Sequence, residues 1–260
     1  MFTKDFHQIW VNIEFDLRAL KNYFWSVAAD LILKPFLYVT LLSAGLSGYI
    51  HSVSAMGQEE ILRFLFPGVT ATLFCGLFSN VVNSCAIERR WGILAIKRRA
   101  GLTRYNHVVS LTLLNLLMFW LQFLCAAIGL LMVIGTMVNV FFLGQLLIRG
   151  SLCAIFWIHL GIAVSSAIPN YKTRDALLSI VIFPLIYTAP TFYPLESAPT
   201  YLAALATLNP LTYQLELLRS KEAAGDDLAL FIVTGTLTLL ASALAINRLI
   251  RIDDCATELA

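Results

Sequence analysis

Charged side chains are scarce in this chain of 260 residues. They make up only 13% of it, whereas hydrophobic residues make up 59% and the mean hydropathy is +0.78. Soluble domains carry about a quarter charged residues. This shortage excludes an ordinary soluble globular domain and predicts an all-α, polytopic membrane protein with no linker or internal repeat, organised as one domain over residues 1–260.

Motifs for binding ATP or metal are also missing from the sequence. No Gly-Lys-Ser or Gly-Lys-Thr occurs, so the chain does not bind ATP through a phosphate loop. Its five cysteines show no paired or metal-like spacing, and we expect neither a disulfide nor a metal site. Residues 1–22 are too polar for the apolar core of a cleavable signal peptide.

Histidine is rare, and only one of the four histidines, His159, lies deep in an apolar run. An ionisable residue inside a membrane is a functional candidate by default. However, no Asp or Glu lies in an apolar run to pair with it, and Ser165 and Ser166 are nearly two turns away. We interpret His159 as a neutral side chain bonded to a neighbouring helix; the alternative is an intramembrane hydrolase or transferase.

The segment 1–24 begins with an amphipathic pattern. From Asp5 to Phe24, apolar residues recur at steps of three or four and so share one helical face. These residues are Phe6, Ile9, Trp10, Ile13, Leu17, Leu20 and Phe24. Such a helix is typical of a membrane surface. The alternative is a helix packed on the core of a soluble domain.

Apolar runs predict six membrane-spanning helices, since each crossing needs about 20 apolar residues. The predicted spans are Leu31–Ile50, Phe64–Ala86, Val108–Gly135, Gln145–Ile168, Ala176–Tyr193 and Leu228–Asn247. Pro184 and Pro190 interrupt the fifth. With both termini on the cytosolic side, that side holds 14 of the 18 Lys and Arg residues, and only Arg63, Arg149, Arg219 and Lys221 lie opposite. The positive-inside rule therefore favours this orientation, with Arg149 snorkelling to the headgroups.

The densest charge cluster lies between the second and third predicted spans, at Glu88–Arg104. It holds six of the 18 basic residues, and unpaired charges cannot lie in hydrocarbon. Gly92 permits a turn, and Ile93, Leu94 and Ile96 form a short apolar ridge before Lys97-Arg98-Arg99. A short helix of this kind can dock into a groove of a cytosolic partner. Alternatively, its cations only anchor the loop at anionic headgroups.

A moderately apolar loop, residues 191–224, follows the fifth predicted span. Tyr201–Leu208 and Leu211–Leu218 are expected to form two short helices separated by Asn209-Pro210. An apolar external loop with several prolines suggests a re-entrant hairpin, which is tolerated where protein or a wet cavity satisfies the backbone. An ordinary surface loop is the alternative.

Four amides, those of Asn80, Asn83, Asn115 and Gln122, fall within the predicted spans. Hydrogen bonds between helices explain them adequately. Asn80 and Asn83 share one helical face, however, and a polar stripe there could line a transport path.

Three regions of the sequence resemble the permease subunit of type-2 ATP-binding-cassette exporters. Leu33, Pro35, Tyr38, Leu41, Leu42 and Gly45 are similar to that family's first span. The loop positions Glu88, Arg89, Gly92, Leu94 and Arg104 resemble its coupling helix, although Gly101 stands where many members have proline. Phe192, Tyr193, Pro194, Pro199, Leu202, Leu208, Asn209, Pro210, Leu211, Thr212, Tyr213 and Arg219 resemble its signature after the fifth span.

The resemblance implies partners and site residues. Two permease copies would pair around a central path, with ATP and Mg²⁺ bound by two separate ATPase subunits below. The positions implied to meet the ATPase are Glu88, Arg89, Arg90, Trp91, Gly92, Leu94, Lys97, Arg98, Arg99 and Arg104. The path is expected to be lined by Tyr38, Asn80, Asn83, Phe192 and Tyr193, and the external signature comprises Pro194, Pro199, Asn209, Pro210 and Tyr213.

Taken together, these features predict a permease that exports an amphipathic molecule, such as a drug, natural product or lipid-linked molecule, across a bacterial inner membrane. The run Lys97-Arg98-Arg99 resembles the drug and natural-product branch of the family more than the branch that exports polysaccharides or lipid-linked glycans, which is the alternative. A further alternative is a scaffold or sensor subunit that moves no cargo. Membrane lipids and a second permease copy are expected partners; nucleic acid is not.

Overall fold

The computed structural model describes residues 2–22, 24–40, 58–134, 140–168, 170–193, 195, 198–220 and 225–258. The described residues contain helices and no strands, which confirms the predicted helical fold for this part of the chain. The helices are α1 (Phe2–Asn22), α2 (Phe24–Ala28), the π-helical η1 (Ala29–Leu33), α4 (Gln58–Arg90), α5 (Ile93–Arg99), α6 (Arg104–Ile134), α7 (Val140–Ser165), α8 (Tyr171–Thr188), α9 (Thr200–Leu208), α10 (Pro210–Arg219) and α11 (Gly225–Glu258).

Within the described residues, four helices are long and apolar enough to cross a membrane: Phe64–Arg90 of α4, Arg104–Met132 of α6, Val140–Ser165 of α7 and Ala229–Arg248 of α11. They correspond to the second, third, fourth and sixth predicted spans. The first predicted span lies partly outside the described residues. The fifth remains a prediction, because α8 has only 18 residues and carries Lys172, Arg174 and Asp175 near its start.

Helix α4 forms the centre of the bundle. Helices α5, α6, α7, α8 and α10 all contact it, and its aromatic side chains Phe66 and Phe74 are fully buried. The ring of Phe74 lies 5.6 Å from that of Phe119 on α6. Phe78 meets Trp157 on α7 edge to face at 5.8 Å. Aromatic packing of this kind fixes how α4 sits between its neighbours.

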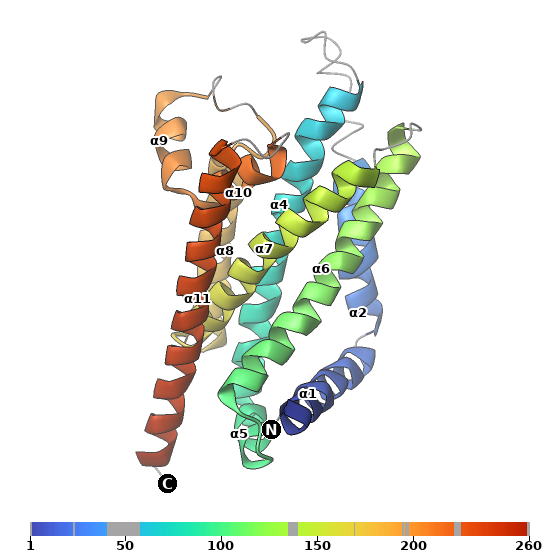
Figure 1. Ribbon diagram of the computed structural model, residues 1–260. Coiled ribbons are helices and arrows are strands. Elements are labelled where there is room, and N and C mark those ends of the chain that lie inside the picture. Colours follow the sequence, from blue (N-terminus) through green and yellow to red (C-terminus); the bar gives the residue numbers. More distant parts are fainter. Residues whose placement is uncertain are drawn as a thin grey trace.

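The long helices run side by side, and the short elements lie at opposite ends of them (Figure 1). Helix α5, the beginning of α1 and the end of α11 lie at one end. Helices α9 and α10 lie at the other, while α1 packs obliquely beside the lower part of α6. The basic turn around α5 and the Pro-containing hairpin therefore face opposite sides of the bundle.

The two short helices predicted after the fifth span are confirmed as α9 and α10. Asn209 separates them: its Oδ1 accepts a hydrogen bond from the Leu211 amide at 2.9 Å, and Pro210 occupies the first turn of α10. The Asn209 Nδ2 donates to the Leu185 carbonyl at 2.7 Å. Pro199 caps α9, and the Tyr213 hydroxyl donates to the Thr207 carbonyl at 2.8 Å. Asn209 thus starts one helix and ties it to α8.

Two buried arginines hold the end of α10. Arg149 is only 7% exposed, and its guanidinium donates to the Leu217 and Ser220 carbonyls at 3.1 and 2.6 Å. The prediction that Arg149 snorkels to the headgroups is therefore wrong, because the carbonyls at a helix C-terminus attract a cation. Arg219 donates to the Pro190 and Thr191 carbonyls at 2.8 and 3.0 Å.

Gly68 allows the loop after α8 to approach α4 closely. A Cβ atom at Gly68 would lie 2.2 Å from the Thr191 carbonyl oxygen, well inside van der Waals contact. A Cβ atom at Gly76, two turns further along α4, would meet nothing within 4 Å. The two glycines therefore have different roles on one helix.

We expect Gly68→Ala to destabilise the protein by about 2 kcal/mol or more, because the backbone of the loop must move to admit the methyl group. Gly76→Ala is the matched control, and it should be neutral or slightly stabilising because alanine is the better helix former. Thermal unfolding of both variants in detergent measures the difference. Equal melting temperatures would contradict the close packing.

Candidate functional site

Two glycines in the left-handed region delimit α5. Gly92 has φ of +67° and precedes the helix, and Gly101 has φ of +93° and follows it. Residues with side chains rarely adopt such values. The predicted turn at Gly92 is confirmed. The φ angle at position 101 accounts for glycine where many family members have proline, because proline fixes φ near −65° and cannot adopt +93°.

A mostly buried ion network joins four helices, α1, α4, α5 and α6. The Lys97 ammonium lies 2.8 Å from Asp16 Oδ1 on α1 and 2.6 Å from Glu88 Oε1 on α4. The three side chains are 9%, 15% and 12% exposed. His107 Nε2, on α6, lies 3.5 Å from Glu88 Oε2. Lys97 and Glu88, both predicted to meet a partner, therefore bind within the chain.

Arg89 and Arg90 connect the same turn to the segment after α7. Arg89 donates to the Ser166 carbonyl at 3.0 Å and to the Ile168 carbonyl. The guanidinium carbon of Arg90 lies 5.1 Å from the centre of the Tyr171 ring. The end of α4 is therefore held against the α7–α8 connection as well as against α1.

Only part of the predicted apolar ridge faces outward. Leu94 is buried and packs with Val81 and Leu111. Trp91 and Ile96, by contrast, are 72% and 66% exposed. Arg99 is exposed, whereas Arg98 and Arg104 are partly buried. The ridge prediction is corrected accordingly: the outward surface, here called the α5 tip, consists of Trp91, Ile96 and Arg99.

Helix α1 turns its polar side toward the protein. Gln8 Nε2 donates to the Gly101 carbonyl at 3.0 Å, and Asn106 Nδ2 donates to Gln8 Oε1 at 2.8 Å. Asn12 is 5% exposed and donates to the Ser110 hydroxyl. The apolar side chains Phe6 and Trp10 remain 70% and 57% exposed. The polar residues that the sequence places on one face thus mediate tertiary contacts.

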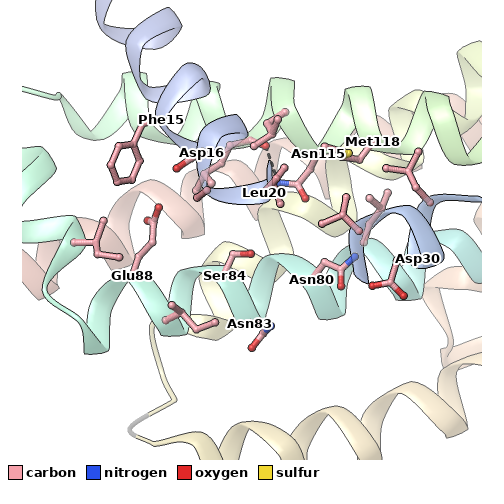
Figure 2. A pocket seen from close by; sticks show the side chains of 18 of the residues that line it. Phe15, Asp16, Leu20, Asp30, Asn80, Asn83, Ser84, Glu88, Asn115 and Met118 are labelled. Carbon is pink, nitrogen blue, oxygen red and sulfur yellow. Dashed lines mark hydrogen bonds between the residues drawn. The ribbon is translucent and has the colours of Figure 1, made fainter. Parts of the chain in front are cut away.

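A cavity of about 360 Å³ lies between α1, α2, η1, α4 and α6, with Ile93 of α5 at its edge. Its lining comprises Phe15, Asp16, Ala19, Leu20, Val27, Asp30, Leu31, Leu77, Asn80, Asn83, Ser84, Ile87, Glu88, Ile93, Leu111, Leu114, Asn115, Met118 and Gln122. Figure 2 shows Asp16 and Glu88 toward one end, and Asp30 and Asn80 toward the other.

Two of the five predicted path residues line this cavity. Asn80 and Asn83 do so together with Asn115 and Gln122, although Asn83 also accepts a hydrogen bond from Arg174. The remaining three lie elsewhere. Tyr38 is 43% exposed, Phe192 lies beside Gly68, and the Tyr193 hydroxyl donates to the Thr188 carbonyl at 3.0 Å. Pro194, of the external signature, lies outside the described residues.

Asp16 and Asp30 are cavity residues that sequence reasoning missed. Asp16 lies on α1 outside the predicted apolar face, and the sequence predicted no contact for it. Asp30 immediately precedes the first predicted span and pairs with Lys34 one turn later. Their charge inside a largely apolar chain was the available signal.

His159 connects three helices, as the neutral interpretation predicts. Its Nε2 lies 3.1 Å from the Thr112 hydroxyl on α6, and its Nδ1 lies 3.0 Å from the Ser242 hydroxyl on α11. Each hydroxyl also lies within hydrogen-bonding distance of a backbone carbonyl of its own helix. Because a neutral imidazole has one donor and one acceptor nitrogen, one hydroxyl donates to His159 and the other donates to its carbonyl while accepting from His159. Sequence reasoning missed these partners because they lie far from His159 along the chain. Among the described residues, no group of three His, Cys, Asp or Glu side chains could hold a metal ion.

Comparison with known proteins places this architecture in a family. The family model described as ABC-2 type transporter matches residues 7–222, which extend from α1 through α10. The chain belongs to the ABC-2 type transporter family. The resemblance found in the sequence is therefore confirmed, and the chain is a membrane protein of this family.

A curated relative named "Putative transport permease ycf38", from Cyanophora paradoxa, is 24% identical over 199 residues. The alignment covers 72% of this chain and 65% of the relative. The chain thus spans about two thirds of that relative's length. This similarity agrees with the family match.

We expect Lys97→Ala to destabilise the protein by about 3 kcal/mol, because it leaves two carboxylates buried side by side without their shared cation. Arg99→Ala removes an exposed cation of the same helix and should change stability by less than about 0.5 kcal/mol. Denaturant unfolding in mixed micelles compares the two variants. If the two variants unfold alike, Lys97 does not have the structural role described.

Proposed function

We propose that this chain is the permease subunit of an ATP-driven exporter that moves an amphipathic molecule out across a bacterial inner membrane. A separate ATPase subunit binds ATP and Mg²⁺ and contacts the α5 tip. The observation that carries the proposal is the α5 tip, with exposed Trp91 in the turn before α5 and exposed Ile96 and Arg99 on α5, at one end of a transporter-family bundle.

The contacts of α5 suit it to transmit force. Lys97 binds Asp16 and Glu88, Leu94 packs into the bundle, and Arg89 holds the segment after α7. Because α4 is the central helix of the bundle, a push on the α5 tip moves the element that α5, α6, α7, α8 and α10 pack against. A flexible loop in the same place would absorb such a movement.

Orientation follows from the charges and from the ends of the helices. The α5 tip, the beginning of α1 and the end of α11 lie at one end of the bundle (Figure 1). With that end in the cytosol, most of the basic residues face inward, six spans cross the membrane, and both termini are cytoplasmic. The first span runs through residues 31–50 and α8 supplies the fifth.

Helix α1 lies at the cytosolic surface of the membrane in this orientation. Phe24 and Trp25, which follow its apolar face, are 60% and 84% exposed. Aromatic side chains favour the boundary between headgroups and acyl chains. The polar face meanwhile bonds to α6 and to Gly101, so α1 supports the α5 tip from the side.

The α9–α10 hairpin covers the external end of the path. Its backbone is satisfied by protein groups, as a re-entrant segment requires, because Asn209, Arg149 and Arg219 bond its ends to the bundle. Burial lowers the pKa of Arg219 to about 10, which leaves it charged at neutral pH. A second copy of the chain completes the path, with the pair held over two ATPase subunits.

The test uses the permease purified with its ATPase subunit and reconstituted in proteoliposomes. Trp91→Ala should lower co-purification of the ATPase and reduce ATP-dependent transport about tenfold or more, because a buried aromatic anchor commonly dominates an interface. Tyr201→Ala is the matched control: Tyr201 is 71% exposed, as against 72% for Trp91, but lies on α9 at the opposite end.

The control variant should keep co-purification of the ATPase. The proposal fails if Trp91→Ala behaves like Tyr201→Ala. Arg99→Glu provides a second probe, since reversing an exposed charge should weaken the same contact without disturbing the buried Lys97 network.

A further inference from the structure

The cavity beside α1 is acidic. Its lining includes three carboxylates, those of Asp16, Asp30 and Glu88, and no Lys, Arg or His side chain. Lys97 pairs with Asp16 and Glu88, and Lys34 pairs with Asp30 at 2.8 Å. Arg174, which donates to Asn83 of the lining, is itself paired with Asp175. The three acids of the lining thus exceed the two lysines paired with them by one.

Two acceptor oxygens at the cavity are buried without a hydrogen-bond partner among the described residues: Gln122 Oε1 and Asp16 Oδ2. Gln122 is only 6% exposed, and its Nε2 donates to the Asp30 carbonyl at 3.3 Å. A buried acceptor left unsatisfied costs about 1–3 kcal/mol. A ligand N–H group at the Asp30 end of the cavity would satisfy Gln122 Oε1.

The rest of the lining is largely apolar, with Leu20, Leu77, Leu114 and Met118 among its members. The volume of about 360 Å³ falls within the range of roughly 300–1,000 Å³ typical of small-molecule sites. Between the two acidic ends, where Figure 2 shows them, the Asn115 amide and the Ser84 hydroxyl supply further polar groups. This combination suits a molecule with an apolar body and a positive, hydrogen-bonding group.

We propose that this cavity binds a small amphiphilic cation with N–H donors, whose positive group lies against Asp30 and whose apolar body packs on the leucines. Its role as the cargo site rests on the proposed export function. Helix α1 forms one wall of the cavity, which places the cavity at the cytosolic leaflet in the proposed orientation. Asp16 and Glu88, at the other end of the cavity, already bind Lys97.

Binding is measured on the full-length permease alone, in nanodiscs of phosphatidylcholine. The probe is ethidium, a fluorescent cation with amino groups and an apolar ring system, and the comparison is anilinonaphthalene sulfonate, a fluorescent amphiphilic anion. Fluorescence anisotropy should show saturable binding of ethidium and none of the anion. Equal binding of the anion would overturn the proposal.

Two variants change the cavity, and each has a matched control. Asp30→Asn should weaken ethidium binding about tenfold, equivalent to about 1.4 kcal/mol, whereas Asp175→Asn, at an exposed acid on α8, should not. Ser84→Trp should fill the cavity and abolish binding, whereas Thr236→Trp, at an exposed site on α11, should not. Melting temperatures verify that each variant folds.

Unchanged ethidium binding in folded Asp30→Asn or Ser84→Trp protein would overturn the proposal that the cation binds in this cavity. The assay contains no ATPase, so its outcome is independent of the coupling experiment at Trp91. If ethidium binds as expected while ATP-dependent transport fails, the cavity remains a cation site and only its role in export is lost.

Discussion

The Lys97 ammonium lies between the Asp16 and Glu88 carboxylates, at 2.8 and 2.6 Å, in a position where all three side chains are mostly buried. Removing charges from water is expensive, and a buried pair is tolerated only when its partners are close and well placed. The position of α5 therefore depends on α1 and α4 together. This interaction also determines which face of α1 meets the protein, and it forms one end of the cavity.

Helix α4 extends from this interaction to the opposite end of the bundle. Its 33 residues correspond to a length of roughly 50 Å at 1.5 Å per residue. At the end opposite α5, Gly68 accepts the close approach of Thr191, and Arg219 donates to the Phe64 carbonyl at 3.3 Å. Helix α4 thus connects the α5 tip to the loop that joins α8 to the α9–α10 hairpin.

Hydropathy in the sequence was sufficient to predict four of the spans, because long apolar runs leave few alternatives. Asn209-Pro210 likewise predicted the break between α9 and α10, since capping and proline act locally. Charge partners could not be predicted in this way. Lys97 and Asp16 are 81 residues apart, and Arg149 lies 68 residues from Leu217, so their pairing exists only after the helices have packed.

The most direct test of the Lys97 interaction is a double-mutant cycle with Lys97→Ala, Glu88→Ala and the double variant, measured by unfolding in mixed micelles. The two side chains should show a coupling free energy of about 2 kcal/mol, within the range for residues in contact. Free-energy changes that add to within about 0.5 kcal/mol would mean that Lys97 and Glu88 act independently. That result would contradict the account of how α5 is held.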